Sequence, residues 1–223
     1  MVPHLISFFG PDGAGKSTQA ELLLNHFQSH KIKAKKAWIR SPHTLAYLVS
    51  RFFVKIGFYR VVSNPFGKQL KIPAVHKNHW LKLFWSVIEL VSTLPPILFR
   101  VYIPLFLGYT IIAERYVVDT VVTIAYYVND LGFLQSRTAR LLLCFVPKNT
   151  VFIHLDSDYS NIIKRRSHTI EPRDFIEFQR IGYKTIGSLV RAEFVDTSRT
   201  SVKQTYTRIM HWLRSKEVFQ SQE

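Results

Sequence analysis

The sequence predicts an α/β protein built on a parallel sheet, with five strands expected and helices covering both faces. Apolar runs of strand length alternate along the chain with stretches whose apolar residues recur at helical spacing. The first run, His4–Phe9, leads into a glycine-rich turn and then into a helical stretch. Because a repeated strand–helix–strand order makes successive strands parallel and buries them between helices, this alternation favours a three-layer architecture.

The length and composition fit one domain with a core that needs no disulfide. The chain has 223 residues, of which 47% are apolar, and a chain of this size buries ~70% of the surface that its unfolded form exposes. No internal repeat, low-complexity tract or linker divides it. We therefore expect a single domain over residues 1–223.

The first half of the chain predicts two strands and two helices before an apolar middle region. In order they lie at His4–Phe9, Ser17–His30, Ala34–Arg40 and Thr44–Gly57. Ser63–Ile72 is rich in polar and turn-forming residues, which indicates a surface loop. Lys77–Phe106 is expected to form two helical pieces divided at Pro95-Pro96, because proline lacks the backbone N–H that a helix interior needs.

The second half continues the alternation. Strands are predicted at Tyr109–Ala113, Thr150–Leu155 and Phe194–Val195. Helices are predicted at Asp119–Asp130, Thr138–Phe145, Ser160–Arg166, Asp174–Arg191 and Ser201–Trp212. The loop between the third and fourth of these helices is basic.

The chain has one cysteine, Cys144, so it cannot form an internal disulfide or a cysteine-rich metal cluster. The N-terminus lacks a basic segment followed by an apolar core, so we expect no signal peptide and a cytoplasmic location. The most apolar stretch, Leu81–Ala113, is interrupted by Glu89, Arg100 and the proline pair. Its charge-free pieces are shorter than the ~20 residues of a spanning helix, which favours buried helices and leaves a peripheral membrane contact as an alternative.

The formal net charge is +15. Such a charge suits a solvated basic surface, nucleic acid, an anionic membrane or phosphate-bearing substrates. Zinc-finger spacing and aromatic RNA-binding strand motifs are absent from the sequence, so no specific nucleic-acid partner is expected.

A phosphate-binding loop is the strongest motif. Residues 10–17 fit G-x-x-x-x-G-K-[ST] at every fixed position, and a predicted strand precedes them and a helix follows. Glycines let backbone N–H groups converge on phosphate oxygens, and the positive end of the helix points at the same anion. The residues expected to bind the triphosphate are Gly10, Pro11, Asp12, Gly13, Ala14, Gly15, Lys16, Ser17 and Thr18. Lys16 would reach the β- and γ-phosphates, and Ser17 would bind magnesium, so the motif predicts ATP and Mg²⁺.

Three stretches carry a resemblance to a known family: FFGPDGAGKSTQ, IIAERYVVDTVVTIAYY and FIHLDSDYSNIIKRRSHTIEPRDFIEFQRIGY. They resemble the loop, the segment after the third strand, and the lid and following helix of thymidylate kinases. The chain looks like an atypical member, since the resemblance covers residues 1–40 and 109–212 but not the apolar, helical region 41–107. It implies a three-layer P-loop kinase fold, a small basic lid at 157–175 and transfer of the ATP γ-phosphoryl group to a nucleoside monophosphate, first of all dTMP. We also expect a homodimer.

The resemblance implies roles for residues around the acceptor nucleotide. Asp12 would face the acceptor sugar and Arg115 would bind the acceptor phosphate. Glu114 takes the place of the family's aspartate near magnesium. Asp119 would contact the acceptor nucleotide, although its position also suits a helix cap.

Other positions matching the family's acceptor contacts are Arg40, which follows the second strand, and Tyr126 or Tyr127. For the tyrosines, a place in the core is the alternative.

The same resemblance implies that the lid supplies catalytic arginines. Gly13 stands where some members carry a catalytic arginine, and members with glycine there supply it from the lid. Here the lid contains Lys164-Arg165-Arg166, with Arg173 beyond. Guanidinium groups bind phosphate with two parallel donors and stabilise the charge of a transferring phosphoryl group. Lys16, Arg115, Arg165 and Arg166 are therefore the catalytic candidates, with a solvated helix face as the alternative for the last two.

The acceptor is the open part of the prediction. The family reads the thymine ring with a phenylalanine and an arginine, and the region 77–108 shows no arginine at that spacing; Arg51 and Arg100 are the conceivable substitutes. Kinases of the same fold with another nucleotide, an apolar alcohol or a sugar as acceptor are the first alternative. The second is a nucleotide-binding switch or nucleic-acid-associated module that uses the loop as a sensor.

Overall fold

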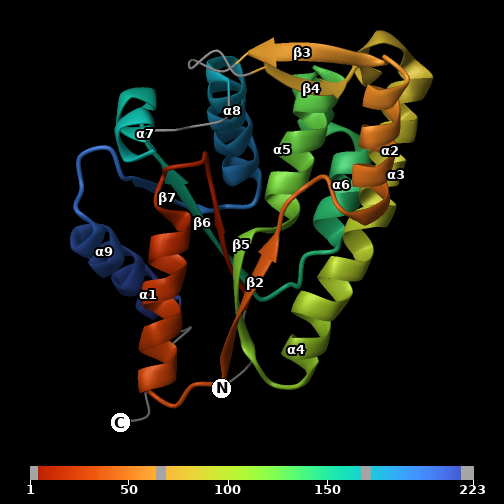
Figure 1. The fold of residues 1–223 in the computed structure, drawn as a ribbon. Helices are drawn as coiled ribbons and strands as arrows, with labels where there is room; N and C mark the ends of the chain where they lie inside the picture. Colours follow the sequence, from red (N-terminus) through yellow and green to blue (C-terminus); the bar gives the residue numbers. More distant parts are fainter. Residues whose placement is uncertain (1–4, 64–68, 167–171, 217–223) are drawn as a thin grey trace.

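The computed structural model describes residues 5–63, 69–166 and 172–216. Its main sheet has five parallel strands in the order β2-β5-β1-β6-β7 (Figure 1), which confirms the predicted fold class. The strands are β1 Leu5–Phe9, β2 Ala34–Ile39, β5 Thr110–Arg115, β6 Thr150–Asp156 and β7 Glu193–Asp196. The predicted strands agree within two residues at each end, and the predicted first residue, His4, lies outside the described residues.

The central strand β1 is buried along its whole length, as expected for a parallel strand with helices on both faces. It lies between β5 and β6, with Phe8 opposite Glu114 and Phe9 opposite His154. On the far side of β5, Ile39 lies opposite Arg115. The carboxyl ends of these strands therefore meet at one edge of the sheet, where ligands bind in open α/β sheets.

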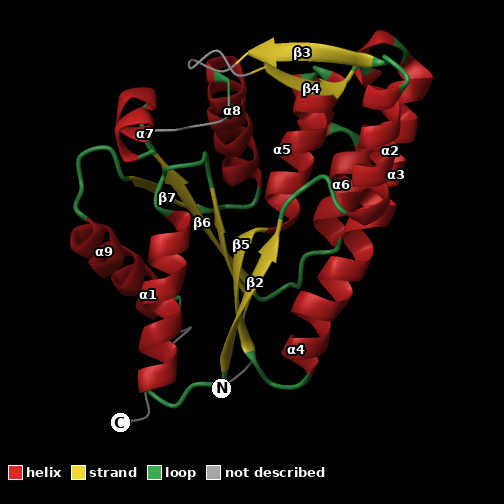
Figure 2. Ribbon diagram, in the orientation of Figure 1, coloured by secondary structure: helices red, strands yellow, loops and turns green. Residues whose placement is uncertain are grey.

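Helices cover both faces of the sheet, as Figure 2 shows. Alternate residues of β1 explain why: Ile6 and Phe8 pack into one apolar cluster, whereas Leu5 and Phe9 pack into another. The first cluster is closed by α1 (Lys16–Ser29) and α9 (Val202–Ser215), and the second by α5 (Tyr116–Val128), α6 (Arg137–Cys144) and α8 (Arg173–Leu189). The short helix α7 (Tyr159–Arg165) follows β6.

The predicted surface loop at Ser63–Ile72 is wrong. After α2 (Thr44–Lys55), strands β3 (Tyr59–Ser63) and β4 (Gln69–Pro73) pair as an antiparallel hairpin, so the middle region is not purely helical. Val62 lies opposite Leu70 and both are half-buried, whereas Val61 and Lys71 are exposed. This alternation of period two is the mark of a half-buried strand, and the turn-forming residues between the two strands concealed it.

The predicted break at Pro95-Pro96 is also wrong. Helix α3 (His79–Ile97) runs through both prolines and continues through a π-helical turn, Leu98–Tyr102, into α4 (Ile103–Phe106). Pro96 cannot donate to the carbonyl of Ser92, but the hydroxyl of Thr44 on α2 lies 3.4 Å from that oxygen. A replacement donor from a neighbouring helix lets a helix tolerate proline.

The combined helix His79–Phe106 has the length and mean hydropathy, 1.4, of a membrane-crossing helix. One face of it nevertheless packs into the core through Trp85, Ile97 and Val101.

Candidate active site

The predicted phosphate-binding loop, residues 10–17, lies between β1 and α1 as expected. Gly10 has φ 139°, and a Cβ at this position would lie 1.8 Å from the carbonyl oxygen of Leu155. Gly13 and Gly15 also have positive φ values, 90° and 91°. Glycine adopts these conformations without steric cost, so the glycines of the motif are required by the path of the loop.

Lys16 is folded back across this loop. Its ammonium group donates to the carbonyl oxygens of Gly10 at 2.8 Å and Pro11 at 2.7 Å, and it lies 3.6 Å from a carboxylate oxygen of Asp12. The side chain is only 5% exposed. The positive charge of Lys16 is therefore held at the loop before any ligand binds, so ligand binding does not have to order the lysine side chain.

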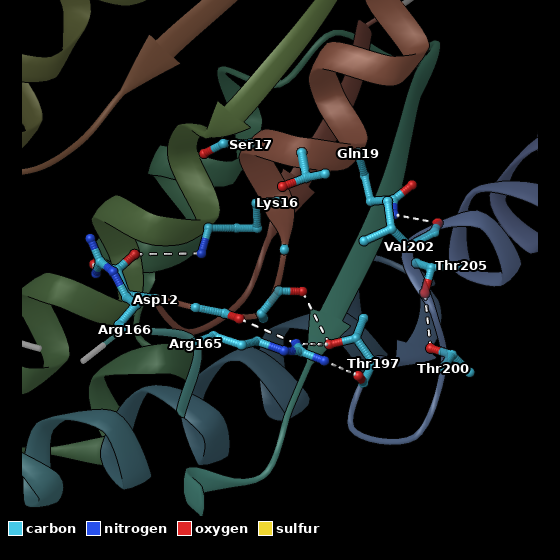
Figure 3. Close-up of a pocket in the computed structure, with 14 residues that line it drawn as sticks. Asp12, Lys16, Ser17, Gln19, Arg165, Arg166, Thr197, Thr200, Val202 and Thr205 are labelled. Atoms are coloured by element: carbon cyan, nitrogen blue, oxygen red, sulfur yellow. Dashed lines mark hydrogen bonds and ion pairs between the residues drawn. The ribbon is translucent and has the colours of Figure 1, made fainter. Parts of the chain in front are cut away.

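The loop opens into a cavity of about 440 Å³, which we call the donor cavity (Figure 3). Its volume lies in the usual range of small-molecule sites, about 300–1,000 Å³. Its lining comes from the loop, α1, the end of α7 and the segment after β7: Asp12, Gly13, Ala14, Gly15, Lys16, Ser17, Thr18, Gln19, Arg165, Arg166, Thr197, Thr200, Val202 and Thr205. The predicted loop residues from Asp12 to Thr18 all belong to it.

Ser17 and Glu114 come together, as the predicted metal site requires. The Ser17 hydroxyl donates to one Glu114 carboxylate oxygen at 2.6 Å, and the Lys36 ammonium lies 2.5 Å from the other. Clusters of three or more His, Cys, Asp or Glu side chains are absent from the described residues. One hydroxyl and one carboxylate suit Mg²⁺, which takes few protein ligands and completes its shell with phosphate oxygens and water. Glutamate therefore fits the place of the family's aspartate.

Asp12 is surrounded by cations. Its carboxylate contacts Arg115 directly, Arg166 at 3.2 Å, and both Lys16 and Arg40 at 3.6 Å. Because one carboxylate faces four cations, positive charge exceeds negative charge at this point. Such an excess beside a phosphate-binding loop attracts anionic groups.

Arg115 is fixed by two carboxylates. Its guanidinium contacts Asp12 and lies 2.9 Å from Asp119, which also accepts a hydrogen bond from the Tyr183 hydroxyl. The backbone of Arg115 has φ 74°, a conformation that costs a non-glycine residue about 1–3 kcal/mol. Asp119, which the resemblance places at the acceptor, contacts Arg115 and Tyr183 in this structure.

A second cavity of about 400 Å³, the acceptor cavity, lies beyond Arg115. The β3–β4 hairpin, the turn after β2, α5 and α8 line it with Trp38, Arg40, Ser41, Pro42, His43, Val62, Leu70, Ile72, Arg115, Thr123, Tyr126, Tyr127, Pro172, Phe175 and Gln179. Arg40 and Arg115 belong to this lining and also contact Asp12, which lines the donor cavity. The two cavities therefore meet at these charged groups.

Several residues of the acceptor cavity escaped the sequence analysis. Val62, Leu70 and Ile72 come from the hairpin that was interpreted as a loop, and their period-two spacing was the available signal. Phe175 and Gln179 are one helical turn apart on α8, a signal too general to point to a cavity. The suggested base-reading residues do not reach it: Arg51 is exposed on α2, and Arg100 donates to the carbonyl of Trp38 at 2.6 Å.

The two lid arginines have different surroundings. Arg165 donates to the carbonyl oxygen of Thr197 at 2.5 Å and to its hydroxyl at 3.0 Å, and it lies 3.3 Å from the carbonyl of Gly13. Arg166 is half-exposed and reaches Asp12 (Figure 3). Of the predicted lid at 157–175, residues 167–171 lie outside the described residues.

This difference predicts unequal effects of substitution. Arg166→Ala is expected to lower the turnover number about 100-fold, because its guanidinium contacts Asp12 beside the predicted phosphate-binding loop and would stabilise charge on a transferring phosphoryl group. Arg165→Ala is expected to combine a smaller loss of turnover with a lower melting temperature, because it connects the lid to Thr197. Steady-state kinetics and thermal melts of both variants check this. Equal turnover losses with unchanged melting would contradict it.

Comparison with known proteins bears on the fold. No model of a protein family matches the chain, and no curated protein matches it in sequence. Solved structures do match. The chain has a thymidylate kinase-like fold. Thymidylate kinase from Ehrlichia chaffeensis superposes with a TM-score of 0.55 at 15% identity, over 96% of this chain and 100% of that one. Thymidylate kinase from Candida albicans superposes with a TM-score of 0.58 at 19% identity, over 96% and 92%.

A buried carboxyl group lies behind the acceptor cavity. Glu89 on α3 is fully buried and accepts a hydrogen bond from the Ser41 hydroxyl at 2.7 Å. Burial raises the pKa of Glu89 from 4.5 to about 8; the Ser41 hydrogen bond opposes this rise and the nearby Asp119 adds to it. The folded protein therefore holds a proton on Glu89 at neutral pH.

This proton predicts a stability that depends on pH. Between pH 4.5 and 8 the unfolded chain has lost the proton and the folded chain keeps it, so the free energy of unfolding falls as pH rises through this window. We expect Glu89 to contribute a fall on the order of 2–4 kcal/mol, and Glu89→Gln to remove it. Urea unfolding at pH 5 and pH 8 measures the fall in the free energy of unfolding for the wild type and for the variant. An equal fall in the two proteins would contradict the prediction.

Proposed function

We propose that the protein transfers the γ-phosphoryl group of ATP to a nucleoside monophosphate, with dTMP giving dTDP as the preferred reaction. The observation that carries the proposal is the meeting of the donor and acceptor cavities at Asp12, Arg40 and Arg115. A triphosphate held by the loop and a monophosphate held by two arginines would place the acceptor oxygen near the γ-phosphorus. Positioning of this kind supplies most of the catalysis in phosphoryl transfer.

In this mechanism the loop amides and Lys16 hold the triphosphate. Ser17 and Glu114 would hold Mg²⁺, which neutralises charge on the β- and γ-phosphates when it is bound. Arg115 and Arg40 hold the acceptor phosphate, whose oxygen forms the new bond to phosphorus as the bond to ADP breaks. Arg166 stabilises the charge on the transferring group, and Arg165 orders the lid end beside it.

The acceptor cavity supports loose selection of the base. Its side walls are mostly aromatic and aliphatic, and Arg51 and Arg100 are absent from its lining. dTMP and dUMP differ only by one methyl group, and the fit of a methyl group distinguishes two ligands by about 1–3 kcal/mol. The Candida albicans relative is described as having broad substrate specificity, a description that agrees with this expectation.

An acceptor screen tests the proposal. With ATP and Mg²⁺, we expect dTMP to be used best, dUMP to follow within about 10- to 200-fold in kcat/KM, and purine monophosphates to be poor acceptors because of their size. ADP release is measured with dTMP, dUMP, dCMP, UMP, dGMP and dAMP under one buffer. If no acceptor increases ADP release, the result would indicate a nucleotide-binding switch and contradict kinase activity.

A second candidate function is phosphorylation of an apolar alcohol. The apolar lining contributed by Val62, Leu70, Ile72 and Phe175 favours it, because such side chains would bind a hydrocarbon chain as well as a base. An isoprenoid alcohol and a sugar are therefore added to the same screen. Transfer to either one, with no turnover of any monophosphate, would replace dTMP as the acceptor class.

A further inference from the structure

The β3–β4 hairpin forms one wall of the acceptor cavity. In Figure 1 it lies across the upper end of α5 and reaches from α2 towards α8. The remaining walls come from α5, α8 and the turn after β2. The hairpin belongs to the region 41–107, to which the resemblance to thymidylate kinases does not extend, so its role has to be inferred from its own contacts.

The two faces of the hairpin have different surroundings. Val62 and Leu70 lie directly opposite each other, are half-buried, and line the acceptor cavity together with Ile72. Val61 and Lys71 form the neighbouring cross-strand pair, and both are exposed. Because side chains alternate between the two faces of a strand, the first group points inward and the second outward. We call Val62, Leu70 and Ile72 the hairpin wall.

Arg60 connects the hairpin to α5. It lies opposite Ile72 in the hairpin, on the same inward face. Its guanidinium donates to the carbonyl oxygen of Tyr126 at 2.9 Å, and its central carbon lies 5.1 Å from the centre of the Tyr126 ring. The Tyr126 ring in turn contacts the ring of Phe175 on α8 with a centroid distance of 4.4 Å. These contacts fix the hairpin wall relative to α5 and α8.

Helix α5 separates the hairpin contact from the charged end of the site. Arg115 immediately precedes this helix, whereas Tyr126 belongs to its last turn. At 1.5 Å per helical residue, the two positions are about 15 Å apart along the helix axis. A monophosphate held by Arg115 at one end of α5 would therefore extend its base towards the end of α5 that the hairpin covers.

The hairpin wall is suited to selection by size. Its three side chains are aliphatic, so they offer no hydrogen bond to a base, and Arg60 holds them in place. A fixed aliphatic wall rejects a larger ligand by steric overlap, which is a recognised source of specificity. The cavity that it closes has a volume of about 400 Å³.

We propose that the hairpin wall sets the size of the base that the acceptor cavity admits. Val62 and Leu70 are the specificity-determining residues, and Arg60 is the residue that positions them. A pyrimidine fits between the hairpin wall, α5 and α8, whereas the second ring of a purine overlaps with Val62 or Leu70. The inference rests on the proposed function, because it takes a nucleoside monophosphate as the acceptor.

Equilibrium binding of dTMP and dGMP tests the proposal. Calorimetric titrations are made with the full chain and saturating ADP, which fills the donor cavity and has no γ-phosphate to transfer. We expect the wild type to bind dTMP at least about tenfold more tightly than dGMP. In Val62→Ala with Leu70→Ala this ratio should fall at least about tenfold, because the truncations make room for the second ring.

A second variant changes the cavity in the opposite direction. Val62→Phe adds volume to the hairpin wall, and phenylalanine is well tolerated in strands. We expect it to weaken dTMP binding at least about tenfold while ADP binding stays unchanged. This variant keeps the test decisive if thermal melting shows that the double alanine variant is unfolded.

Val61→Ala with Lys71→Ala is the matched control. It truncates the neighbouring cross-strand pair on the outward face. The loss of the Lys71 charge should affect both ligands equally, since dTMP and dGMP carry the same phosphate group. The control should therefore keep the wild-type ratio of dTMP to dGMP affinity.

Arg60→Met tests the positioning role. Arg60 does not line the cavity, so this substitution leaves the lining residues unchanged and removes only the bond to Tyr126. We expect faster amide hydrogen exchange in β3 and β4 and a lower ratio of dTMP to dGMP affinity, with ADP binding unchanged.

The outcomes separate this inference from the proposed function. An unchanged affinity ratio in the folded double alanine variant, unchanged dTMP binding in Val62→Phe, or an equal fall of the ratio in the outward control overturns the proposal. A wild type that binds neither monophosphate also overturns it. If the variants behave as expected but no monophosphate is phosphorylated, the hairpin proposal is supported and the kinase activity is contradicted.

Discussion

Lys16→Ala is expected to lower phosphoryl transfer by about three orders of magnitude or more while the protein stays folded. The ammonium group lies in a preformed loop and would stabilise charge on the γ-phosphate in the transition state, where such interactions are worth most. Its present partners are two backbone carbonyls, of Gly10 and Pro11, and the carboxylate of Asp12. Because these groups keep other partners or reach water after the substitution, we expect a small change in melting temperature.

Single-turnover ADP formation and a thermal melt measure the two quantities. Lys33→Ala is the matched control, since it removes an exposed lysine at the other end of the sheet, between α1 and β2. The control should retain wild-type transfer. A folded Lys16→Ala variant within about threefold of the wild-type rate would refute the assignment of the loop.

The parts of the fold that the sequence predicts correctly are those in which local pattern and packing agree. β1 is apolar at nearly every position, the loop after it has glycines where φ is positive, and α1 follows with helical spacing. Each of these features is encoded within a few residues, so no distant contact is needed to predict them.

The errors lie where distant residues decide the structure. A proline pair would end an isolated helix. In α3 the helix continues, because the Thr44 hydroxyl from α2 supplies a donor to the carbonyl of Ser92 that the proline leaves without one. The β3–β4 hairpin packs against α2, and the turn-forming residues between its strands led to the prediction of a loop. Neither contact is visible in the local sequence, because the partners are separated by many residues.

The same limit applies to the site. The motif alone predicts that Lys16 and Ser17 lie at the phosphates, whereas the place of Glu114 near magnesium is implied only by the resemblance to thymidylate kinases. The pairing of Asp119 with Arg115 and Tyr183 required the structure, since α8 contributes the tyrosine from 64 positions away. A role in holding an arginine and a role in binding a ligand have the same sequence signature.

Arg115→Ala is expected to raise the acceptor Michaelis constant about 100-fold or more with a smaller change in turnover. A guanidinium that binds a phosphate in the ground state contributes about 3 kcal/mol, and each 1.4 kcal/mol corresponds to a factor of ten. The variant should also be less stable. Asp12 and Asp119 are buried, and removing one partner of a buried ion pair typically costs about 3–5 kcal/mol.

Arg115→Gly separates these two effects. Both variants lack the guanidinium, but glycine tolerates the φ of 74° that alanine does not. We therefore expect the glycine variant to use the acceptor as poorly as the alanine variant, and to unfold at a higher denaturant concentration, with a gain of about 1 kcal/mol. Steady-state kinetics with both substrates varied, and urea unfolding of both proteins, measure the two effects. An unchanged acceptor Michaelis constant in both variants would show that the acceptor phosphate binds elsewhere, and a glycine variant no more stable than alanine would show that the backbone at this position carries no strain.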